Sequence, residues 1–445
     1  MTAVADPPAG PSTRPAAGPS ATPGRSAVGR LVRRRRASAS RVDPVQRRHR
    51  RALLLVLALV PIAFLDLKFT YQLTGVAWLV DLAVVAPLAL LEPVDARVLR
   101  KVAPYLAFLA LACLSLAWTP DLFRGVATLL QLFVPLPVYL LAARVRDPAT
   151  FLKQASRICT AAIGLAGLLT VATLANALPA ALPLSPRPMA IGLIVLFVIA
   201  SLGAGRQRTA ILGAATLLIG VTTGARTASA VALLMIILSP AWRLRWRGRT
   251  ALALIGLVSV LAFSRTAAFQ DRFFFGEQGT LTDALTGSSS LNTAGRRELW
   301  PKLTQDCGQT PVLGQGLGAA SGLAYEYTYG VLSQPHNDYL RTYCDVGYVG
   351  SVPFWGFFLL SAGGGLTLAR RGRPVGAAAG QLVLALLLLA ITDNPLVYTA
   401  HFMAPTALIL GFAAAERAGP RRPGVVPGGP RRAALPALPA QQPPA

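Results

Sequence analysis

Charged residues are scarce in this chain. Asp, Glu, Lys and Arg make up only 14% of its 445 residues, whereas hydrophobic residues make up 53%. A water-soluble domain carries roughly a quarter charged residues. Because long apolar runs occupy the space that charge would otherwise fill, the composition indicates an integral membrane protein and excludes an ordinary soluble enzyme.

Acidic residues are the scarcer of the two signs, so the net charge is +25. A polynucleotide-binding protein would gather its basic residues on one soluble domain, with aromatic residues among them. Here they lie in short stretches between apolar runs. We therefore expect no nucleic-acid partner.

Metal-ligating residues are also few, with four cysteines and three histidines. The cysteines show no C-x-x-C spacing, and the glycine-rich segment 314–318 lacks the Lys-Ser/Thr ending of a nucleotide-binding loop. We expect no metal and no cofactor. Cys307 and Cys344 lie in or beside one long loop, where they can form a disulfide or remain as thiols, and their spacing leaves both open.

What the chain does have is a series of apolar runs between two polar ends. Residues 1–29 are rich in Pro, Ala, Gly, Ser and Thr, and we expect this segment and the Pro/Gly/Arg-rich tail to be disordered. A basic patch leads directly into the first run without a clear cleavage site, which predicts an uncleaved first helix. The predicted parts are a cytoplasmic N-terminus (1–51), helices 1–9 (52–264), a large extracytoplasmic loop (265–345), helices 10–12 (346–414) and a cytoplasmic tail (415–445).

The fold class predicted from these runs is an all-α polytopic membrane protein with about twelve transmembrane helices. Each run must be helical, because an open backbone cannot face lipid. The runs fall at about 52–68, 75–92, 103–118, 122–143, 158–178, 189–204, 209–223, 227–242, 250–264, 346–368, 375–393 and 395–414.

The distribution of positive charge tests this topology. With twelve spans and the N-terminus inside, most of the 43 Lys and Arg fall in cytoplasmic segments, as the positive-inside rule requires. Residues 265–345 are then outside, and a loop of that length, containing short helices, is usually functional. We find no internal repeat of the kind common in transporters.

Arginines at the outer edge of the membrane oppose that bias and are costly unless they face a polar cavity. Arg226 lies at the start of the eighth run, where its guanidinium can either bind an anion or extend to the lipid headgroups. In the outer loop, the spacing from Arg296 to Leu303 predicts a short helix on the membrane surface. Arg297 follows directly, and Arg265 stands at the start of the loop.

The segment 311–318 carries alternating glycines, which suit a tight turn with close backbone approach. It is followed by His336, at the predicted outer face, which can act as a general base or be a hydrogen-bonded surface histidine. His401, within the last run, is expected to be a structural hydrogen-bonding residue. Asp81 and Asp393 lie in or beside spans and need a partner, and Asp393 is a second candidate base.

These residues resemble the O-antigen ligase and O-antigen polymerase family of bacterial envelope proteins. The similarity extends over roughly residues 190–410. Each motif alone is weakly specific, but their order, their spacing and their predicted position on the outer side of the membrane are much more specific. The motifs are Thr223-Gly224-Ala225-Arg226, Gly295-Arg296 with Trp300, Pro311-x-x-Gly314-x-Gly316-x-Gly318, His336-Asn337-x-Tyr339-Leu340 and Asp345-Val346-Gly347-Tyr348-Val349-Gly350.

The resemblance implies a multi-pass protein of the bacterial cytoplasmic membrane that transfers a glycan without a metal. The donor would be linked to undecaprenyl diphosphate, and the acceptor would be a hydroxyl of a growing polysaccharide or other envelope acceptor. It implies that Arg226 and Arg296 engage the diphosphate and that His336 activates the acceptor, with inversion expected. Further substrate-binding candidates are Arg265, Arg297, Asn337, Tyr339 and Arg341.

Two other classes remain open from the sequence. Peptidoglycan polymerases of the cell-shape and division group share the lipid carrier but should carry a catalytic aspartate in an outer loop. A twelve-helix transporter or flippase would place its unusual residues near the middle of the membrane. Polymerase and ligase differ only in the acceptor, so the chain alone does not separate them.

Overall fold

The computed structural model describes residues 43–64, 70–175, 185–242 and 296–418, with a few isolated positions between 248 and 265. The chain divides into two units, Met1–Arg47 and Arg48–Ala445. Only residues 43–47 of the first are described, and the account below concerns the second. Predictions for the two chain ends, for the ninth run and for most of the loop before residue 296 lie outside the described residues.

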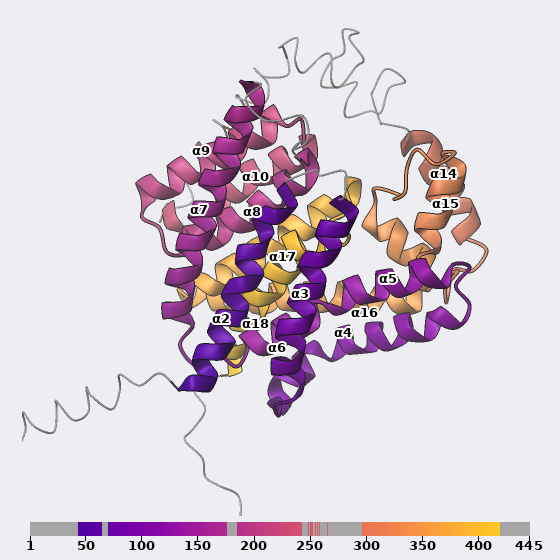
Figure 1. Ribbon diagram of the computed structural model, residues 1–445, viewed down its shortest axis with the longest axis horizontal. Helices are drawn as coiled ribbons and strands as arrows, with labels where there is room; N and C mark the ends of the chain where they lie inside the picture. Colours follow the sequence, from indigo (N-terminus) through magenta and orange to yellow (C-terminus); the bar gives the residue numbers. More distant parts are fainter. Residues whose placement is uncertain are drawn as a thin grey trace, which may run out of the picture. The chain divides into compact units, whose positions relative to one another are not determined.

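All regular elements among the described residues are helices (Figure 1). They are α2 (Pro44–Leu59), η1 (Val60–Phe64), α3 (Thr70–Leu90), α4 (Ala96–Leu114), η2 (Ser115–Ala117), α5 (Leu122–Phe133), α6 (Pro135–Ala142), α7 (Pro148–Leu174), α8 (Pro186–Leu202), α9 (Arg206–Thr222), α10 (Arg226–Leu238), η3 (Pro240–Trp242), α14 (Arg296–Cys307), α15 (Ala319–Tyr327), α16 (Asp338–Arg370), α17 (Pro374–Thr392), the π-helical η4 (Thr399–Met403) and α18 (Ala404–Ala418).

The all-helical membrane class is confirmed. Among the described residues, five helices are long and apolar enough to cross a membrane, and three shorter apolar helices accompany them. The five are Ala96–Ala117, Leu122–Ala142, Pro148–Leu174, Asp338–Arg370 and Pro374–Thr392. The count of twelve spans and the single large outer loop stay predictions.

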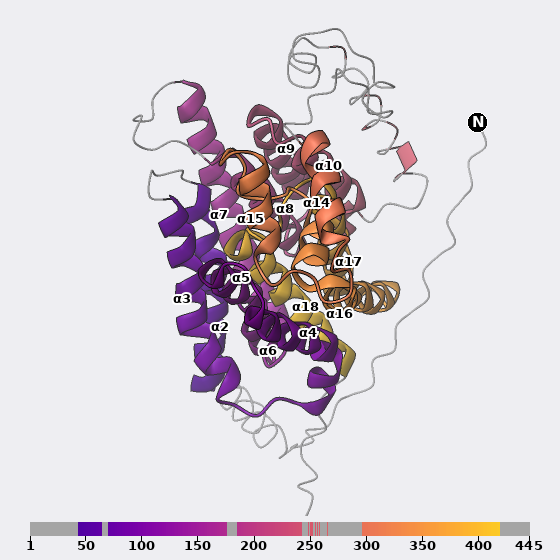
Figure 2. The ribbon, with the colours of Figure 1, turned by 90° about the vertical axis from the view of Figure 1, so that its right-hand side faces the viewer.

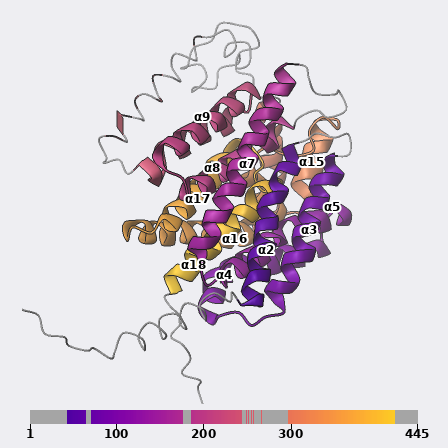
Figure 3. The same ribbon diagram turned by 60° about the vertical axis from the view of Figure 1, so that its left-hand side comes forward.

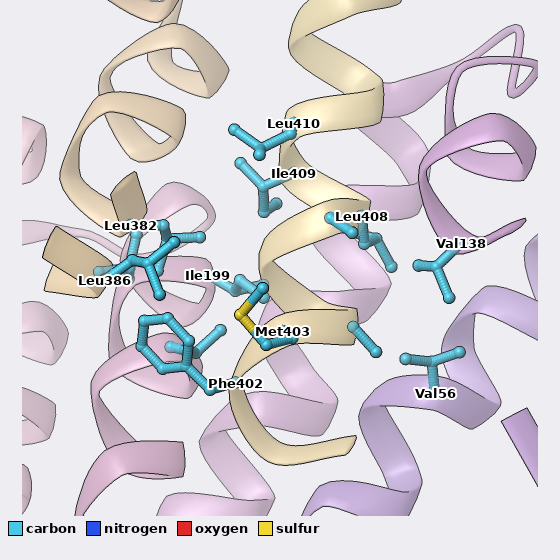
Figure 4. Close-up of a cluster of buried hydrophobic side chains, with 14 of the residues drawn as sticks. Val56, Val138, Ile199, Leu382, Leu386, Phe402, Met403, Leu408, Ile409 and Leu410 are labelled. Atoms are coloured by element: carbon cyan, nitrogen blue, oxygen red, sulfur yellow. The ribbon is translucent and has the colours of Figure 1, made fainter. Parts of the chain in front are cut away.

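Helix α18 forms the centre of the packed core. It contacts α4, α6, α16 and α17, and Figure 4 shows side chains from several helices gathered around it. Phe402 and Leu408 are fully buried there, whereas Leu168 on α7 and Leu218 on α9 are about two-thirds exposed. Helices α7, α8 and α9 pack side by side (Figure 3). Large apolar side chains on the outside of such a bundle are what a lipid-facing surface requires.

Helix α16 is broken at Gly347, which has φ 60° and ψ −165°. The glycine segment 311–318 runs along this break. The N–H groups of Gln315 and Gly316 donate to the carbonyls of Cys344 and Asp345, at 2.8 and 3.0 Å. A Cβ at Gly314 would lie 2.6 Å from the Gly347 nitrogen, so both chains need glycine here. The predicted close backbone approach is confirmed.

Helices α14 and α15 pack against the first part of α16 (Figure 2). Leu299 and Leu303 of α14 are buried against Ala324 of α15. A disulfide joins Cys307, at the end of α14, to Cys344 in α16, with the Cα atoms 4.9 Å apart. Of the two possibilities for these thiols, the structure therefore shows the disulfide, and it ties α14 to the start of the long helix.

Candidate functional site

The turn between α17 and η4, residues 393–398, is attached to the start of α16. The carboxylate of Asp338 is buried and accepts a hydrogen bond from the N–H of Leu396 at 2.9 Å. Asn337 caps α16 by accepting from the N–H of Leu340, also at 2.9 Å. Two chain segments that are distant in sequence are thereby held together just where His336 precedes the helix.

His336 occupies a backbone conformation that side chains seldom adopt, with φ +54°. Its Nδ1 lies 2.9 Å from Nδ2 of Asn394 and 3.9 Å from Oδ1 of Asp393. The side chains of His336 and Asp393 are only 12% and 8% exposed. Both contacts are made at Nδ1, so the tautomer decides the role of the ring: Nε2 can take a proton from a bound molecule when Nδ1 carries the ring proton, and not when Nδ1 accepts from the Asn394 amide.

The electrostatic surroundings of His336 oppose its protonation. Burial is the largest cause that lowers its pKa, and Arg187 and Arg296 lower it further, while Asp393 raises it. The net direction is downward. The imidazole is therefore neutral at neutral pH, which is the form that a general base needs.

Arg296 is the first residue of α14 and lies in the same neighbourhood. Its pKa is lowered, mainly by burial and then by Arg187, while Asp393 and Tyr398 favour its charge. Its Nε is buried without a hydrogen-bond partner in the described part of the chain. A buried cation with an unused donor is costly unless a ligand completes it.

Trp300, one turn along α14, links this helix to the histidine. Its indole N–H donates to the carbonyl of Pro335 at 2.7 Å. An open hollow beside Arg296 is lined by Trp300 and Pro301. The helix that carries the arginine therefore also fixes the residue before His336.

Arg226 is the first residue of α10, at the predicted start of that helix. The hydroxyl of the next residue, Thr227, lies 2.7 Å from that of Thr392, which directly precedes Asp393. This contact brings the start of α10 to the same turn that holds His336. The structure thus gathers the starts of α10, α14 and α16 around residues 393–398.

Arg187 is the residue that the sequence analysis missed. It lies in the first turn of α8, it is exposed, and its charge acts on both Arg296 and His336. The signal was present in the sequence, because Arg187 also opens an apolar run on the predicted outer side, as Arg226 does.

Three of the substrate-binding candidates have other partners. Tyr339 donates its hydroxyl to the carbonyl of Leu387 at 2.9 Å, and Asn337 is the α16 cap. Arg341 is 3% exposed and lies 3.9 Å from the carboxylates of Asp338 and Asp345. These contacts stabilise the scaffold, and the geometry does not favour a substrate role for these three side chains.

The remaining candidates are less informative. Arg265 is exposed, and its sequence neighbours lie outside the described residues. Arg297 belongs to α14, but its side chain also lies outside the described part. Among the described residues, no group of three His, Cys, Asp or Glu side chains could hold a metal ion.

Two polar residues within the helices depart from expectation. His401 was expected to form hydrogen bonds, but it is fully buried and neither ring nitrogen has a hydrogen-bond partner among the described residues. Its ring instead packs edge-on against Tyr398, with centroids 6.2 Å apart. Asp81 is likewise 1% exposed, and within the described residues its carboxylate has no hydrogen-bond partner. Only Asp393, of the two acids singled out, lies at the candidate site.

Comparison with known proteins is consistent with this geometry. None of the curated proteins matches the chain. A family model described as O-Antigen ligase matches residues 210–355. The matched region includes Arg226, Arg296 and His336, together with the glycine segment and the break in α16. The resemblance to the O-antigen ligase family that the motifs indicated is therefore confirmed over residues 210–355.

Proposed function

We propose that this protein is a membrane glycosyltransferase that moves a glycan from a polyprenyl-diphosphate carrier to an acceptor hydroxyl. The observation that carries the proposal is the position of His336, largely buried beside Asp393 and Asn394 and under the influence of the Arg296 guanidinium, whose Nε has no hydrogen-bond partner among the described residues. A base and an anion-binding cation side by side are the two groups that this reaction needs.

In the proposed reaction, Nε2 of His336 takes the proton of the acceptor hydroxyl. The acceptor oxygen forms a bond to the anomeric carbon while the bond from that carbon to the carrier's phosphate oxygen breaks. The electron pair leaves with the diphosphate, whose growing negative charge is stabilised by Arg296, Arg226 and Arg187. Attack opposite the leaving group gives inversion.

The role of His336 depends on which proton its ring carries. Oδ1 of Asp393 lies 3.9 Å from Nδ1, beyond hydrogen-bond distance, and its negative charge favours a proton on that nitrogen electrostatically. Asn394 can accept a hydrogen bond from a protonated Nδ1 through its amide oxygen when its side-chain amide is turned by 180°. A proton at Nδ1 leaves a lone pair at Nε2, and Asp393 then stabilises the imidazolium that forms during transfer.

We further propose that the site faces the outside of the cytoplasmic membrane of a bacterium, with both chain ends in the cytoplasm. The disulfide between Cys307 and Cys344 supports this side, because disulfides persist in oxidising compartments and are rare in the cytosol. Labelling of single cysteines introduced at exposed positions such as Tyr329 with an impermeant reagent tests it. Labelling in intact cells is expected, and protection until lysis would contradict the proposal.

The decisive experiment is His336→Gln in the purified protein, assayed with a lipid-linked glycan and an acceptor glycan. We expect a loss of transfer of at least about 100-fold, the range of general-base contributions. Arg157→Gln, an exposed change on α7, is the control and should keep wild-type activity. Full transfer by His336→Gln would overturn the assignment of His336 as the base. If the wild type shows no transferase activity but translocates lipid, and His336→Gln loses that translocation, a flippase would be favoured.

The acceptor divides the proposal into a polymerase and a ligase. A strain lacking the protein should accumulate single lipid-linked repeat units if the protein is a polymerase. It should accumulate long unattached chains if the protein is a ligase. An unchanged envelope polysaccharide would contradict both.

A further inference from the structure

A second cluster of cations lies in a pocket that the proposed reaction does not use. The pocket has a volume of about 210 Å³ and is enclosed by the start of α4, the end of α6, the middle of α16 and the end of α18. Its lining includes Arg100, Lys101 and Arg417, with Leu360 and Leu410 among the apolar members. No carboxylate is among the described residues that line it.

Part of this charge has an internal use. Lys101 donates to the carbonyl of Ala414 at 2.7 Å, and Arg97 donates to that of Ala418 at 3.2 Å. Both carbonyls belong to the last turn of α18, where cations are favourable. The amino group of Lys101 keeps two further donors, and Asp95, the acidic group that acts on it, already caps α4 by accepting from the Arg97 N–H.

Arg100 and Arg417 have no such explanation. Neither pairs with a carboxylate in the described part of the chain. The guanidinium of Arg417 lies directly over Gly364 of α16, in the space that a Cβ would occupy. The absence of a side chain at Gly364 thus creates the seat for this cation. The result is three cations that line one pocket together with apolar residues such as Leu360 and Leu410.

We propose that this pocket binds a phosphate group, and that the phosphate belongs to an anionic phospholipid. Three cations without a facing carboxylate favour an anion, and guanidinium binds phosphate through paired hydrogen bonds. The lipid source is favoured over a free anion because Leu360 is 65% exposed and lies beside the cations, so a lipid can leave its acyl chains on the helix surface. Basic pockets between the ends of membrane helices commonly hold anionic headgroups.

The test uses the full chain in nanodiscs that contain phosphatidylcholine with or without phosphatidylglycerol. In the nanodiscs, phosphatidylglycerol is expected to raise the melting temperature of the protein. When the protein is purified in detergent, phosphatidylglycerol is expected to be enriched among the lipids that remain bound to it. Removing charge in Lys101→Gln and Arg417→Gln should weaken this binding about fivefold for each cation. Arg157→Gln, which removes an equal charge outside the pocket, should leave it unchanged.

Two variants that leave the net charge unchanged make the test sharper. Gly364→Ala places a methyl group where the Arg417 guanidinium lies, whereas Gly363→Ala places it where nothing lies within 4 Å. The flexible arginine can move aside, so both variants should fold. Gly364→Ala should weaken phosphatidylglycerol retention several-fold and Gly363→Ala should not.

Three outcomes would overturn either the anion site or the assignment of its phosphate to a lipid. Equal retention of the two lipids by the wild type would exclude an anion site. Equal behaviour of Gly364→Ala and Gly363→Ala would exclude the seat at Gly364. Stabilisation by inorganic phosphate without enrichment of phosphatidylglycerol would overturn the lipid and assign the pocket to a soluble anion.

Discussion

The glycine at position 347 offers a sharp test of how the site is assembled. Its φ of 60° and ψ of −165° lie in a region that residues with a Cβ avoid. A Cβ there would contact the carbonyl of Val312 and lie 2.7 Å from the nitrogen of Gly314. Gly347→Ala must therefore either strain the break in α16 or displace the glycine segment 311–318.

The cost follows from these two effects. Strain at such a conformation is about 1–3 kcal/mol. Displacement would also break the bonds that Tyr348 and Val349 donate to the carbonyls of Pro311 and Val312, at 2.9 and 3.1 Å. Each such bond contributes about 1 kcal/mol. We expect Gly347→Ala to lower the free energy of unfolding by about 4 kcal/mol, a large part of the stability of an ordinary domain.

The assay is thermal denaturation of the purified protein, followed by the loss of its monodisperse peak in size-exclusion chromatography. Gly356→Ala is the matched control, because it lies in the same helix and nothing within 4 Å would meet its Cβ. That variant should be unchanged or slightly more stable, since alanine favours a helix over glycine. If Gly347→Ala melts at the same temperature as Gly356→Ala, our account of the break is wrong.

Three further predictions concern the site and its scaffold. In the pH profile of transfer, Arg296→Gln removes a charge that lowers the pKa of His336, so the acidic limb should move to higher pH, whereas Asp393→Asn should move it to lower pH and reduce the maximal rate. Shifts in the same direction would contradict this. Reduction of the Cys307–Cys344 disulfide, which closes a separation of 37 residues, should cost about 4 kcal/mol in melting experiments with and without reductant, and an unchanged melting temperature would contradict it. Arg341→Met should destabilise the protein by about 3 kcal/mol because Asp338 and Asp345 lose their buried partner, and a stable variant with only a raised KM would show that Arg341 binds substrate instead.

Local sequence patterns predicted the local structure well. The apolar run expected from residue 346 lies within α16, which begins earlier, at Asp338, and is broken at Gly347. The spacing after Arg296 predicted a helix that the structure extends to Cys307. The alternating glycines predicted close backbone approach without indicating the partner. That partner is α16, some thirty residues away, and no periodicity records a contact over such a distance.

The last run shows how a tertiary contact overrides apolar composition. It was expected to be helical from residue 395, but α18 begins at Ala404, after a turn and a π-helix. Asp338 accepts from the N–H of Leu396 and so holds that backbone outside the helix. The π-helical turn that follows occurs rarely, and composition does not predict it.

The candidate site was only partly visible in the sequence. His336 and Asp393 were both selected as possible bases, but their proximity depends on the packing of α16 against α17. The sequence did not indicate that two carboxylates lie beside Arg341, and its role as a further anion-binding arginine stays a prediction. The pairing of Cys307 with Cys344 was undecided because a spacing of two cysteines does not fix the distance between them in space.

The disulfide has a consequence for how substrates reach the site. The disulfide links α14, which carries Arg296, to the part of α16 that follows His336. The indole N–H of Trp300 also donates a hydrogen bond to the carbonyl of Pro335, the residue before His336. These two links restrict the movement of Arg296 relative to His336. In the proposed reaction, such a preorganised centre would need little closure when a substrate binds, so most of the conformational adjustment would fall on the bound donor.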